Sequence, residues 1–415
     1  MNDLMQFWPA WIQPSAGLPT VQWAVLLALA AAAGHMLQRR LGLPKVLGYS
    51  IIGALAGFTG FTTTHWPLEG IGLFMVELGL SVLLFEAGGR LTLRWFRHNP
   101  MLLVQSLAES ALTFAAVYGV LQLFEVDAEL LAPLSLLAVT TSPAVLMRVA
   151  ADIRSSGPVT DRAITLAALN TLYVLALGGV MARFLGRPAA SLTDAFVPVV
   201  LLLSISVLLG AVLALALRGT LRLMSPTSEN TSVTLLALVV ACTTLAANFG
   251  GSAPLAALLA GILLKALHPR PWSWPRQFGT ASSILTILMF VLVSMAAAQA
   301  EWNLTAFSLI AAVVLARTLA KTLAIGVAGI GSGASLYQAF WTACAMWPMS
   351  AVALLLVSQF TLFTPEFGNQ IAALALPLIL LMEVLGALMS TMALQRSGEA
   401  AFPLVSATAT GGDAP

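Results

Sequence analysis

The stretch LLAVTTSPAVLMRVAADIRSSGPVTDRAITLAALNTLYVLALGG, residues 136–179, decides the fold of this chain. It holds two hydrophobic segments joined by a short polar turn. The first segment is interrupted by TTSP at 140–143, and the second carries NT at 170–171. Pro143 has no backbone N–H and disfavours helical geometry at Ser142. In hydrocarbon a broken helix is tolerated only where it is buried in protein or lines a polar cavity. The polar residues beside this break therefore predict a substrate-binding site.

The composition is typical of a membrane protein with many transmembrane helices. Hydrophobic residues make up 59% of the 415 residues and charged residues only 9%, whereas soluble proteins contain about a quarter charged residues. The mean hydropathy is +0.93. The net charge of +2 comes from dispersed loop residues, so nucleic-acid binding is not indicated. No metal-ligand spacing, nucleophile–base pair or phosphate loop occurs, and we expect no enzyme, metal site or cofactor.

The hydrophobic segments predict about thirteen transmembrane helices, since a span needs about 20 apolar residues. They are 18–38, 46–63, 70–89, 100–124, 129–151, 160–185, 193–217, 231–249, 252–268, 280–299, 304–329, 336–358 and 367–392. We therefore expect an all-α, polytopic protein with one transmembrane domain at 18–392. The N-terminal segment 1–17 is expected to lie outside, and 393–415 to form a short, disordered cytoplasmic tail.

The loop charges predict the orientation in the membrane. With the N-terminus outside, nearly all loop Lys and Arg residues fall on the cytoplasmic side, and only Arg183 and Arg187 fall outside. This is the asymmetry that the positive-inside rule describes. We expect a bacterial inner (cytoplasmic) membrane protein whose C-terminus is cytoplasmic.

An odd number of spans allows an inverted repeat, in which spans 1–6 match spans 8–13 and the seventh is a linker. The interrupted fifth span then pairs with the twelfth, which contains MWPMS at 346–350. Interrupted segments at corresponding positions of two inverted halves are the best sequence indication of a transporter site. We expect the two broken helices to cross.

Six stretches along the chain carry a family resemblance. They are LGLPKVLGYSIIGALAGF (41–58), ELGLSVLLFEAGGRLTLRWFR (77–97), TTSPAVL (140–146), NFGGSAPLAALLAGILL (248–264), LARTLAKTLAIGVAG (315–329) and MEVLGALMSTMALQRSGE (382–399). In this order and spacing they resemble the monovalent cation:proton antiporter superfamily, near its sodium/proton exchanger and potassium-efflux branches. The resemblance covers nearly the whole chain. It implies a secondary transporter that exchanges Na⁺ or K⁺ for H⁺, a dimerisation module and a mobile core module, an elevator-like motion and a homodimer in the lipid bilayer.

The chain departs from the family pattern at one position. The resemblance implies an Asp at the second position of the pair on the sixth helix, where this chain has Thr171 after Asn170. Neutral Asn and Thr can offer oxygens to a dehydrated cation, but neither side chain titrates at physiological pH. Proton exchange therefore requires another acid, or the chain has a different function.

Two acids within the spans are candidates for this role, because charged residues in a membrane are functional hypotheses by default. Glu109 lies well inside the fourth span and can hold either a proton or a cation. Glu86 lies late in the third span, at a place where some members of the resembled family have an acid. The structural alternatives are an ion pair of Glu109 with Lys321 or Arg317, and a pair of Glu86 with Arg90.

The other candidates have supporting roles. Lys321 resembles the eleventh-helix lysine that pairs with the missing Asp in electrogenic family members. Arg317, one turn earlier, is expected to brace the half-helices at least as much as it serves transport, and Glu383 in the last span is expected to be structural. Thr141 and Ser142 can present oxygens to an ion or satisfy the broken backbone.

Three functions remain open. The leading hypothesis is monovalent cation/H⁺ antiport with cation ligands from Thr141, Ser142, Asn170 and Thr171. A site with two basic residues and no sixth-helix acid can also favour an anion or an organic solute. A degenerate, non-transporting membrane subunit is the third.

Overall fold

A computed structural model describes residues 21–61, 66–91, 93–184, 192–225, 228–267, 276–300 and 304–401, and these ranges contain helices and no strands. The expected external segment 1–17 lies outside the described residues. The helices in chain order are α1 (Val21–Leu41), α2 (Lys45–Thr59), α3 (Gly70–Arg90), α4 (Leu93–His98), α5 (Met101–Leu123), α6 (Ala128–Val139), α7 (Pro143–Asp152), α8 (Pro158–Phe184), α9 (Leu192–Leu223), α10 (Glu229–Phe249), α11 (Ala253–Leu267), α12 (Arg276–Ala298), α13 (Leu304–Gly331), α14 (Leu336–Ala345), α15 (Ala351–Phe363) and α16 (Pro365–Arg396).

Each expected span coincides with one helix or with a broken pair. Within the described ranges, 9 segments are long and apolar enough to cross a membrane, one of them being the α6–α7 pair taken together. The shorter apolar helices α2, α11 and α15 have 15, 15 and 13 residues. The all-α, polytopic prediction is confirmed, while the count of thirteen crossings stays a prediction.

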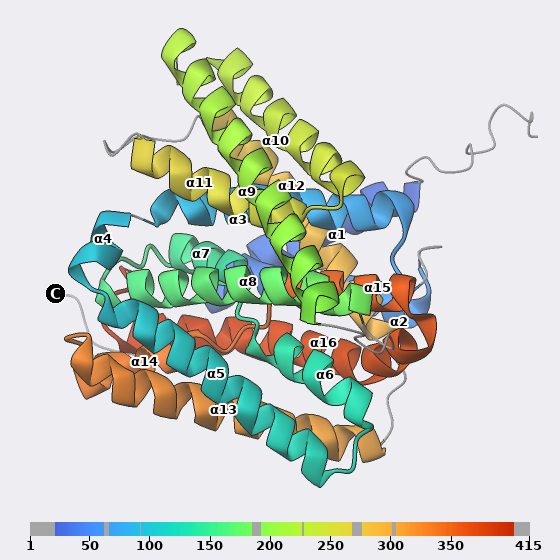
Figure 1. Ribbon diagram of the computed structural model, residues 1–415. Coiled ribbons are helices and arrows are strands. Elements are labelled where there is room, and N and C mark those ends of the chain that lie inside the picture. Colours follow the sequence, from blue (N-terminus) through green and yellow to red (C-terminus); the bar gives the residue numbers. More distant parts are fainter. Residues whose placement is uncertain are drawn as a thin grey trace, which may run out of the picture.

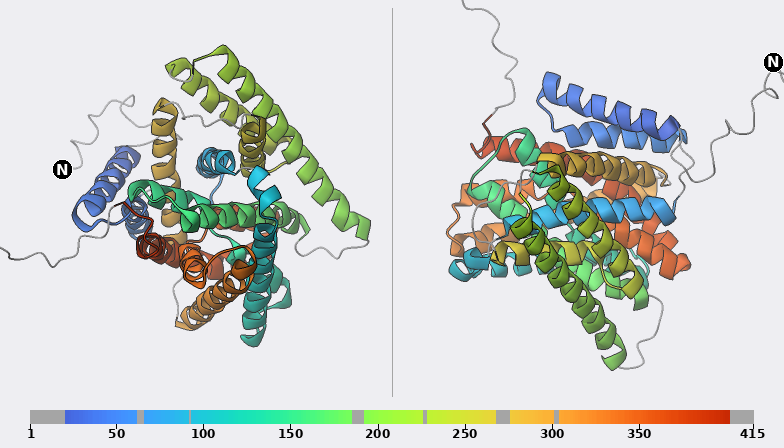
Figure 2. Two further views of the ribbon diagram at one scale, coloured as in Figure 1. Left: turned by 90° about the vertical axis from the view of Figure 1, so that its left-hand side faces the viewer. Right: turned by 90° about the horizontal axis from the view of Figure 1, so that it is seen from above.

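The helices pack into two groups. The outer group comprises α1–α3 and α9–α12, and the site group comprises α5–α8 and α13–α16. In Figure 1, α9–α11 lie at the top and α5 and α13 at the bottom, with α8 and α16 between them. The two turned views in Figure 2 show the helices packed against one another in one bundle. The groups meet where α16 packs on α2 and α12, and where α8 packs on α9.

Glycines allow close packing within the outer group. A Cβ atom at Gly88 of α3 would collide with the carbonyl oxygen of Leu258 in α11, and one at Gly261 would collide with that of Phe85. Small residues of this kind let membrane helices approach backbone to backbone. The pair α3–α11 is therefore a rigid part of the outer group.

The two predicted breaks are present. Residues 140–142 separate α6 from α7, and residues 346–350 separate α14 from α15. The breaks lie against each other, because the backbone N–H of Ser142 donates to the carbonyl of Pro348 at 3.0 Å. In the predicted repeat, α5 precedes the first break and α13 occupies the corresponding position before the second. These two helices are also in contact.

The last helix extends into the segment 393–415, which we expected to form a tail. Helix α16 continues to Arg396. The Glu399 carboxylate then accepts hydrogen bonds from the backbone N–H groups of Val159 and Thr160 at 2.7 and 2.8 Å, which caps the N-terminal end of α8. Unsatisfied N–H groups at a helix start favour a carboxylate partner. The rest of the expected tail, 402–415, lies outside the described residues.

Candidate cation site

Each break is formed by its local sequence. Pro143 is the first residue of α7, and the Ser142 hydroxyl caps this helix by accepting from the N–H of Val145 at 3.2 Å. In the second break the Ser350 hydroxyl accepts from the N–H of Val352 at 3.2 Å and caps α15. Serine N-caps satisfy backbone donors at a helix start. The ends of α6 and α14, by contrast, leave carbonyl oxygens that need partners.

Arg317 of α13 supplies those partners for both breaks. Its side chain is fully buried. Nε donates to the carbonyl of Ala138 at 2.8 Å, and the terminal nitrogens donate to those of Thr140 and Trp347, each at 2.7 Å. A cation at the C-terminal end of a helix is stabilised by the helix dipole. Arg317 thus bonds to the carbonyl ends of both broken helices.

Lys321, one turn after Arg317, forms a buried ion pair with Glu109 of α5. The side chains are 1% and 0% exposed. The Lys321 ammonium donates to Glu109 Oε1, and it also lies 3.1 Å from both the Val139 carbonyl oxygen and the Thr141 hydroxyl. The ammonium therefore occupies a position surrounded by three oxygen atoms from three different residues. Oxygen ligands of this kind are also those that hard metal cations prefer.

Asn170 of α8 completes the surroundings of Glu109. Its Nδ2 donates to Glu109 Oε2 at 2.7 Å, and its Oδ1 accepts from the Ser110 hydroxyl at 2.9 Å. The Thr113 hydroxyl lies 3.4 Å from Glu109 Oε1. Both carboxylate oxygens thus have donors, and Asn170 orients the acid.

Thr171 faces the first break. Its hydroxyl donates to the carbonyl of Ala167 at 2.9 Å, within α8, and lies 3.3 Å from the carbonyl of Thr141. The Thr141 hydroxyl in turn lies 3.4 Å from the Met346 carbonyl in the second break. Thr171 is therefore a hydroxyl donor to the backbone at the position where the family resemblance implies an acid.

Comparisons with known proteins identify the family. A transmembrane family of sodium/hydrogen exchangers matches residues 25–402. The chain belongs to that family. This family member is accordingly a multi-pass membrane transporter and not an enzyme.

Solved structures share its fold at low sequence identity. The structure of the sodium proton antiporter MjNhaP1 from Methanocaldococcus jannaschii at pH 8 has 15% identity and a TM-score of 0.71, and the match covers 91% of this chain and 98% of that one. A second structure of the same antiporter, an electron microscopy map, gives 14% identity, a TM-score of 0.69 and the same coverage. No curated protein matches the chain in sequence.

Two of the predicted acids lie away from the cluster in this family member. Glu86 of α3 is half-buried, and the ion pairs among the described residues are Lys45–Asp152 and Lys321–Glu109, so the expected Glu86–Arg90 pair is not formed. Glu383 of α16 is buried at the contact with α2 and α12, bonded to Ser50 and Ser294. The cluster unites Glu109, Asn170, Thr171, Thr141, Ser142, Lys321 and Arg317.

Sequence reasoning missed part of the polar network. Ser110 and Thr113 were not recognised as partners of Asn170 and Glu109, although they lie one and four residues from Glu109. Arg148 of α7 was not singled out, although it lies within the fifth expected span. It donates to the hydroxyls of Ser282 and Thr286 in α12, both at 2.8 Å, and so joins the two helix groups. The sequence feature that could have revealed these partners is the presence of Ser and Thr residues inside otherwise apolar helices.

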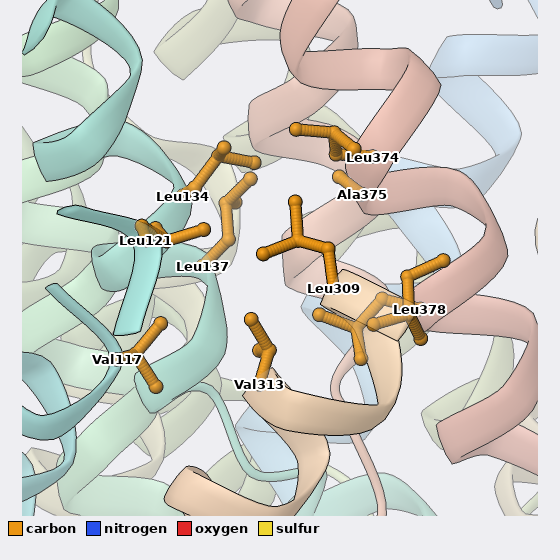
Figure 3. A pocket seen from close by; sticks show the side chains of 10 residues that line it. Val117, Leu121, Leu134, Leu137, Leu309, Val313, Leu374, Ala375 and Leu378 are labelled. Atoms are coloured by element: carbon orange, nitrogen blue, oxygen red, sulfur yellow. The ribbon is translucent and has the colours of Figure 1, made fainter. Parts of the chain in front are cut away.

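An apolar pocket borders the cluster. Figure 3 shows its lining of aliphatic side chains from α5, α6, α13 and α16. Val117 lies two turns beyond Glu109 on α5, Leu137 lies in the last turn of α6 before the first break, and Val313 lies one turn before Arg317. A wall of hydrocarbon offers no oxygen to a cation. The pocket therefore limits the site on one side and is not part of it.

Proposed function

We propose that this chain is a monovalent cation/proton antiporter in which Glu109 carries the exchanged charge. The observation that carries the proposal is the position of the Lys321 ammonium. It is surrounded by Glu109 Oε1, the Val139 carbonyl and the Thr141 hydroxyl, which are ligands that suit a dehydrated Na⁺ or K⁺. The ammonium thus stands where a cation would bind.

The exchange follows from charge balance in a buried site. A metal ion that binds to Glu109 must displace the positive charge of Lys321, because a second buried cation beside it would be unpaired. Release of one proton from the Glu109–Lys321 pair balances the arrival of one monovalent ion. The two groups form a coupled pair, so the proton belongs to the pair and not to either residue alone.

The remaining residues support this step. Asn170 holds Glu109 Oε2, and Thr171 and Arg317 hold the backbone carbonyls of the breaks. The proposal includes a homodimer in a bacterial inner membrane, with the N-terminus outside, and an elevator-like movement of the site group against the outer group. The separation of the helices into two groups supports that movement.

A second candidate, transport of an anion or organic solute, rests on the two buried basic residues. The hydrogen bonds of Arg317 weigh against it, because its guanidinium is already bonded to three backbone carbonyls. Arg317 would have to break these hydrogen bonds in order to bind an anion. The test below separates the two candidates.

Proteoliposomes with an imposed pH gradient test the function. We expect Na⁺ or K⁺, added as chloride, to dissipate the gradient, and choline chloride to leave it in place. Dissipation by neither ion at any pH would refute antiport. Dissipation that follows the anion, when gluconate replaces chloride, would support the second candidate. Absence of every flux would support a non-transporting subunit.

A further inference from the structure

A second buried acid, Glu383 of α16, lies at the contact between the two helix groups. Its side chain is 3% exposed. Oε1 lies 3.0 Å from the hydroxyl of Ser50 in α2, and Oε2 lies 3.0 Å from the hydroxyl of Ser294 in α12. Helix α16 belongs to the site group, whereas α2 and α12 belong to the outer group. One carboxyl group therefore bridges both groups through two neutral donors.

No cation compensates this acid within the part of the chain that the structure describes. The ion pairs found there do not include Glu383. Lys45 pairs with Asp152, and Arg148 bonds to hydroxyls of α12. The described ionisable groups on the helices packed against α16 are Lys45, Tyr49, Glu129, Arg148, Asp152, Arg317, Lys321, Tyr337 and Cys344. The bonds of the Glu383 carboxyl go to the two serines and to none of these groups.

Burial without a counter-charge determines the protonation state of the Glu383 carboxyl group. An isolated carboxylate in a low-dielectric interior is costly, and it takes up a proton instead. Both serine hydroxyls lie within donor distance of the carboxyl oxygens. Because a hydroxyl can also accept, a neutral acid keeps both contacts, with its C=O oxygen accepting from one serine and its O–H donating to the other. The two hydroxyls satisfy a protonated Glu383 completely, but they cannot neutralise an ionised one.

The same helix face connects Glu383 to the cation site. Gly386, three residues later, packs against the second break so closely that a Cβ atom there would collide with the backbone of Pro348. The Ser390 hydroxyl, one further turn along, donates to the carbonyl of Ala345 at the end of α14 at 3.0 Å. A displacement of the broken helices therefore moves α16, and the contacts of Glu383 must break for the site group to slide.

We propose that Glu383 is a second proton-binding residue of the antiporter, which acts as a latch between the helix groups. As a neutral acid it ties α16 to Ser50 and Ser294. Loss of its proton leaves a buried charge that the two serine hydroxyls cannot neutralise. The closed contact then loses stability relative to an arrangement in which the carboxylate reaches water, and the site group is freed to move. This role rests on the proposed antiport function, but it is separate from cation binding at Glu109. Glu383 is thus a positioning residue that sets the pH at which transport is fast.

The decisive variant is Glu383→Gln, which keeps the hydrogen bonds and cannot lose a proton. In proteoliposomes we expect the wild-type rate to rise with pH, and the variant to lose about threefold or more of that rise, because its latch stays closed. Glu366→Gln is the matched control, because Glu366 lies on the same helix and is exposed. Equal pH profiles for Glu383→Gln and wild type would overturn the proposal.

A second variant acts in the opposite direction. The double substitution Ser50→Ala and Ser294→Ala keeps the acid and removes its partners, so it is expected to raise the rate at the acidic end of that profile and to flatten the profile. Thr391→Val is its control, because the buried Thr391 hydroxyl bonds only within α16, to the Ala387 carbonyl at 2.8 Å. If Glu383→Gln fails to fold, this double variant decides alone: an unchanged profile rejects the latch.

A readout without transport separates this proposal from the antiport function. In detergent, the melting temperature of the full-length wild-type chain should fall relative to that of Glu383→Gln as the pH rises, because the unfolded chain releases the Glu383 proton while the buried native site still holds it. If wild type exchanges no cation yet shows this relative fall, the proton-binding role of Glu383 stands and the antiport proposal fails. Equal pH dependence of melting in both proteins would refute the role of Glu383.

Discussion

Glu109 and Lys321 form a buried ion pair although they lie 212 residues apart in the sequence. Glu109 comes from α5 and Lys321 from α13, the helices that precede the two breaks. The pair therefore joins the two halves of the chain at the point where both halves are interrupted. It supplies the ionisable acid that Thr171 cannot provide, and the predictions below depend on it.

Glu109→Gln should abolish cation-dependent proton flux. The amide can keep a hydrogen bond to Asn170, but it cannot balance a bound metal ion, so we expect the rate of gradient dissipation to fall by more than about a hundredfold, which corresponds to about 2.8 kcal/mol. The assay is Na⁺- and K⁺-driven dissipation of a pH gradient in proteoliposomes. Glu86→Gln should retain flux, and a result in which only Glu86→Gln is inactive would transfer the role to Glu86.

Lys321→Met should destabilise the protein more than the double variant Glu109→Gln, Lys321→Met. The single change leaves a buried carboxylate without its cation, which costs about 3–5 kcal/mol, whereas removal of both charges avoids this cost. Thermal unfolding of the single and double variants in detergent forms a double-mutant cycle. Additive losses in that cycle would mean that the two side chains do not interact.

Arg317→Lys should lower both the melting temperature and the transport rate. Lysine keeps the charge but has no planar fork, so it cannot reach the carbonyls of Ala138, Thr140 and Trp347 together. Buried acceptors that lose their donors cost about 1–3 kcal/mol each. Arg183→Lys is a suitable control, because Arg183 donates to the single carbonyl of Gly250. A wild-type melting temperature for Arg317→Lys would show that the breaks are held by other contacts.

Thr171→Ser should keep transport, and Thr171→Asp should impair it. Serine retains the hydroxyl that bonds to the carbonyls of Ala167 and Thr141. An ionised Asp has no proton to donate, and its charge would face the Thr141 carbonyl and add a second acid beside Glu109. The initial rates of both variants in the proteoliposome assay distinguish these outcomes. Activity that appears only in Thr171→Asp would identify the natural chain as a degenerate family member.

The helices and their breaks could be predicted from the sequence because local rules govern them. Apolar runs of sufficient length specify helices in a bilayer, and Pro143 and Pro348 interrupt two of them. The tail was misjudged where Glu399 returns to cap α8, since a lone acid in a polar segment gives no sign of a distant helix start.

The site could be predicted only as a set of residues. Each of Glu109, Asn170, Thr171, Lys321 and Arg317 was singled out because it is polar within a span. Their pairing depends on how α5, α8 and α13 rotate about their axes, which packing decides and periodicity does not reveal. For that reason the Glu86–Arg90 pair was a reasonable expectation from i,i+4 spacing, and yet it is not formed. The serines that hold Glu383 were missed for the same reason.

Arg317 also determines the order in which the protein can be assembled. Its hydrogen bond to the Thr140 carbonyl spans 177 residues of sequence. At a synthesis rate of roughly 5–20 residues per second, α13 follows the first break out of the ribosome by roughly 10–35 s. During this interval the carbonyls at the end of α6 lack their native partner. Until α13 is synthesised, the first half of the chain therefore lacks the side chain that binds these carbonyls in the native structure.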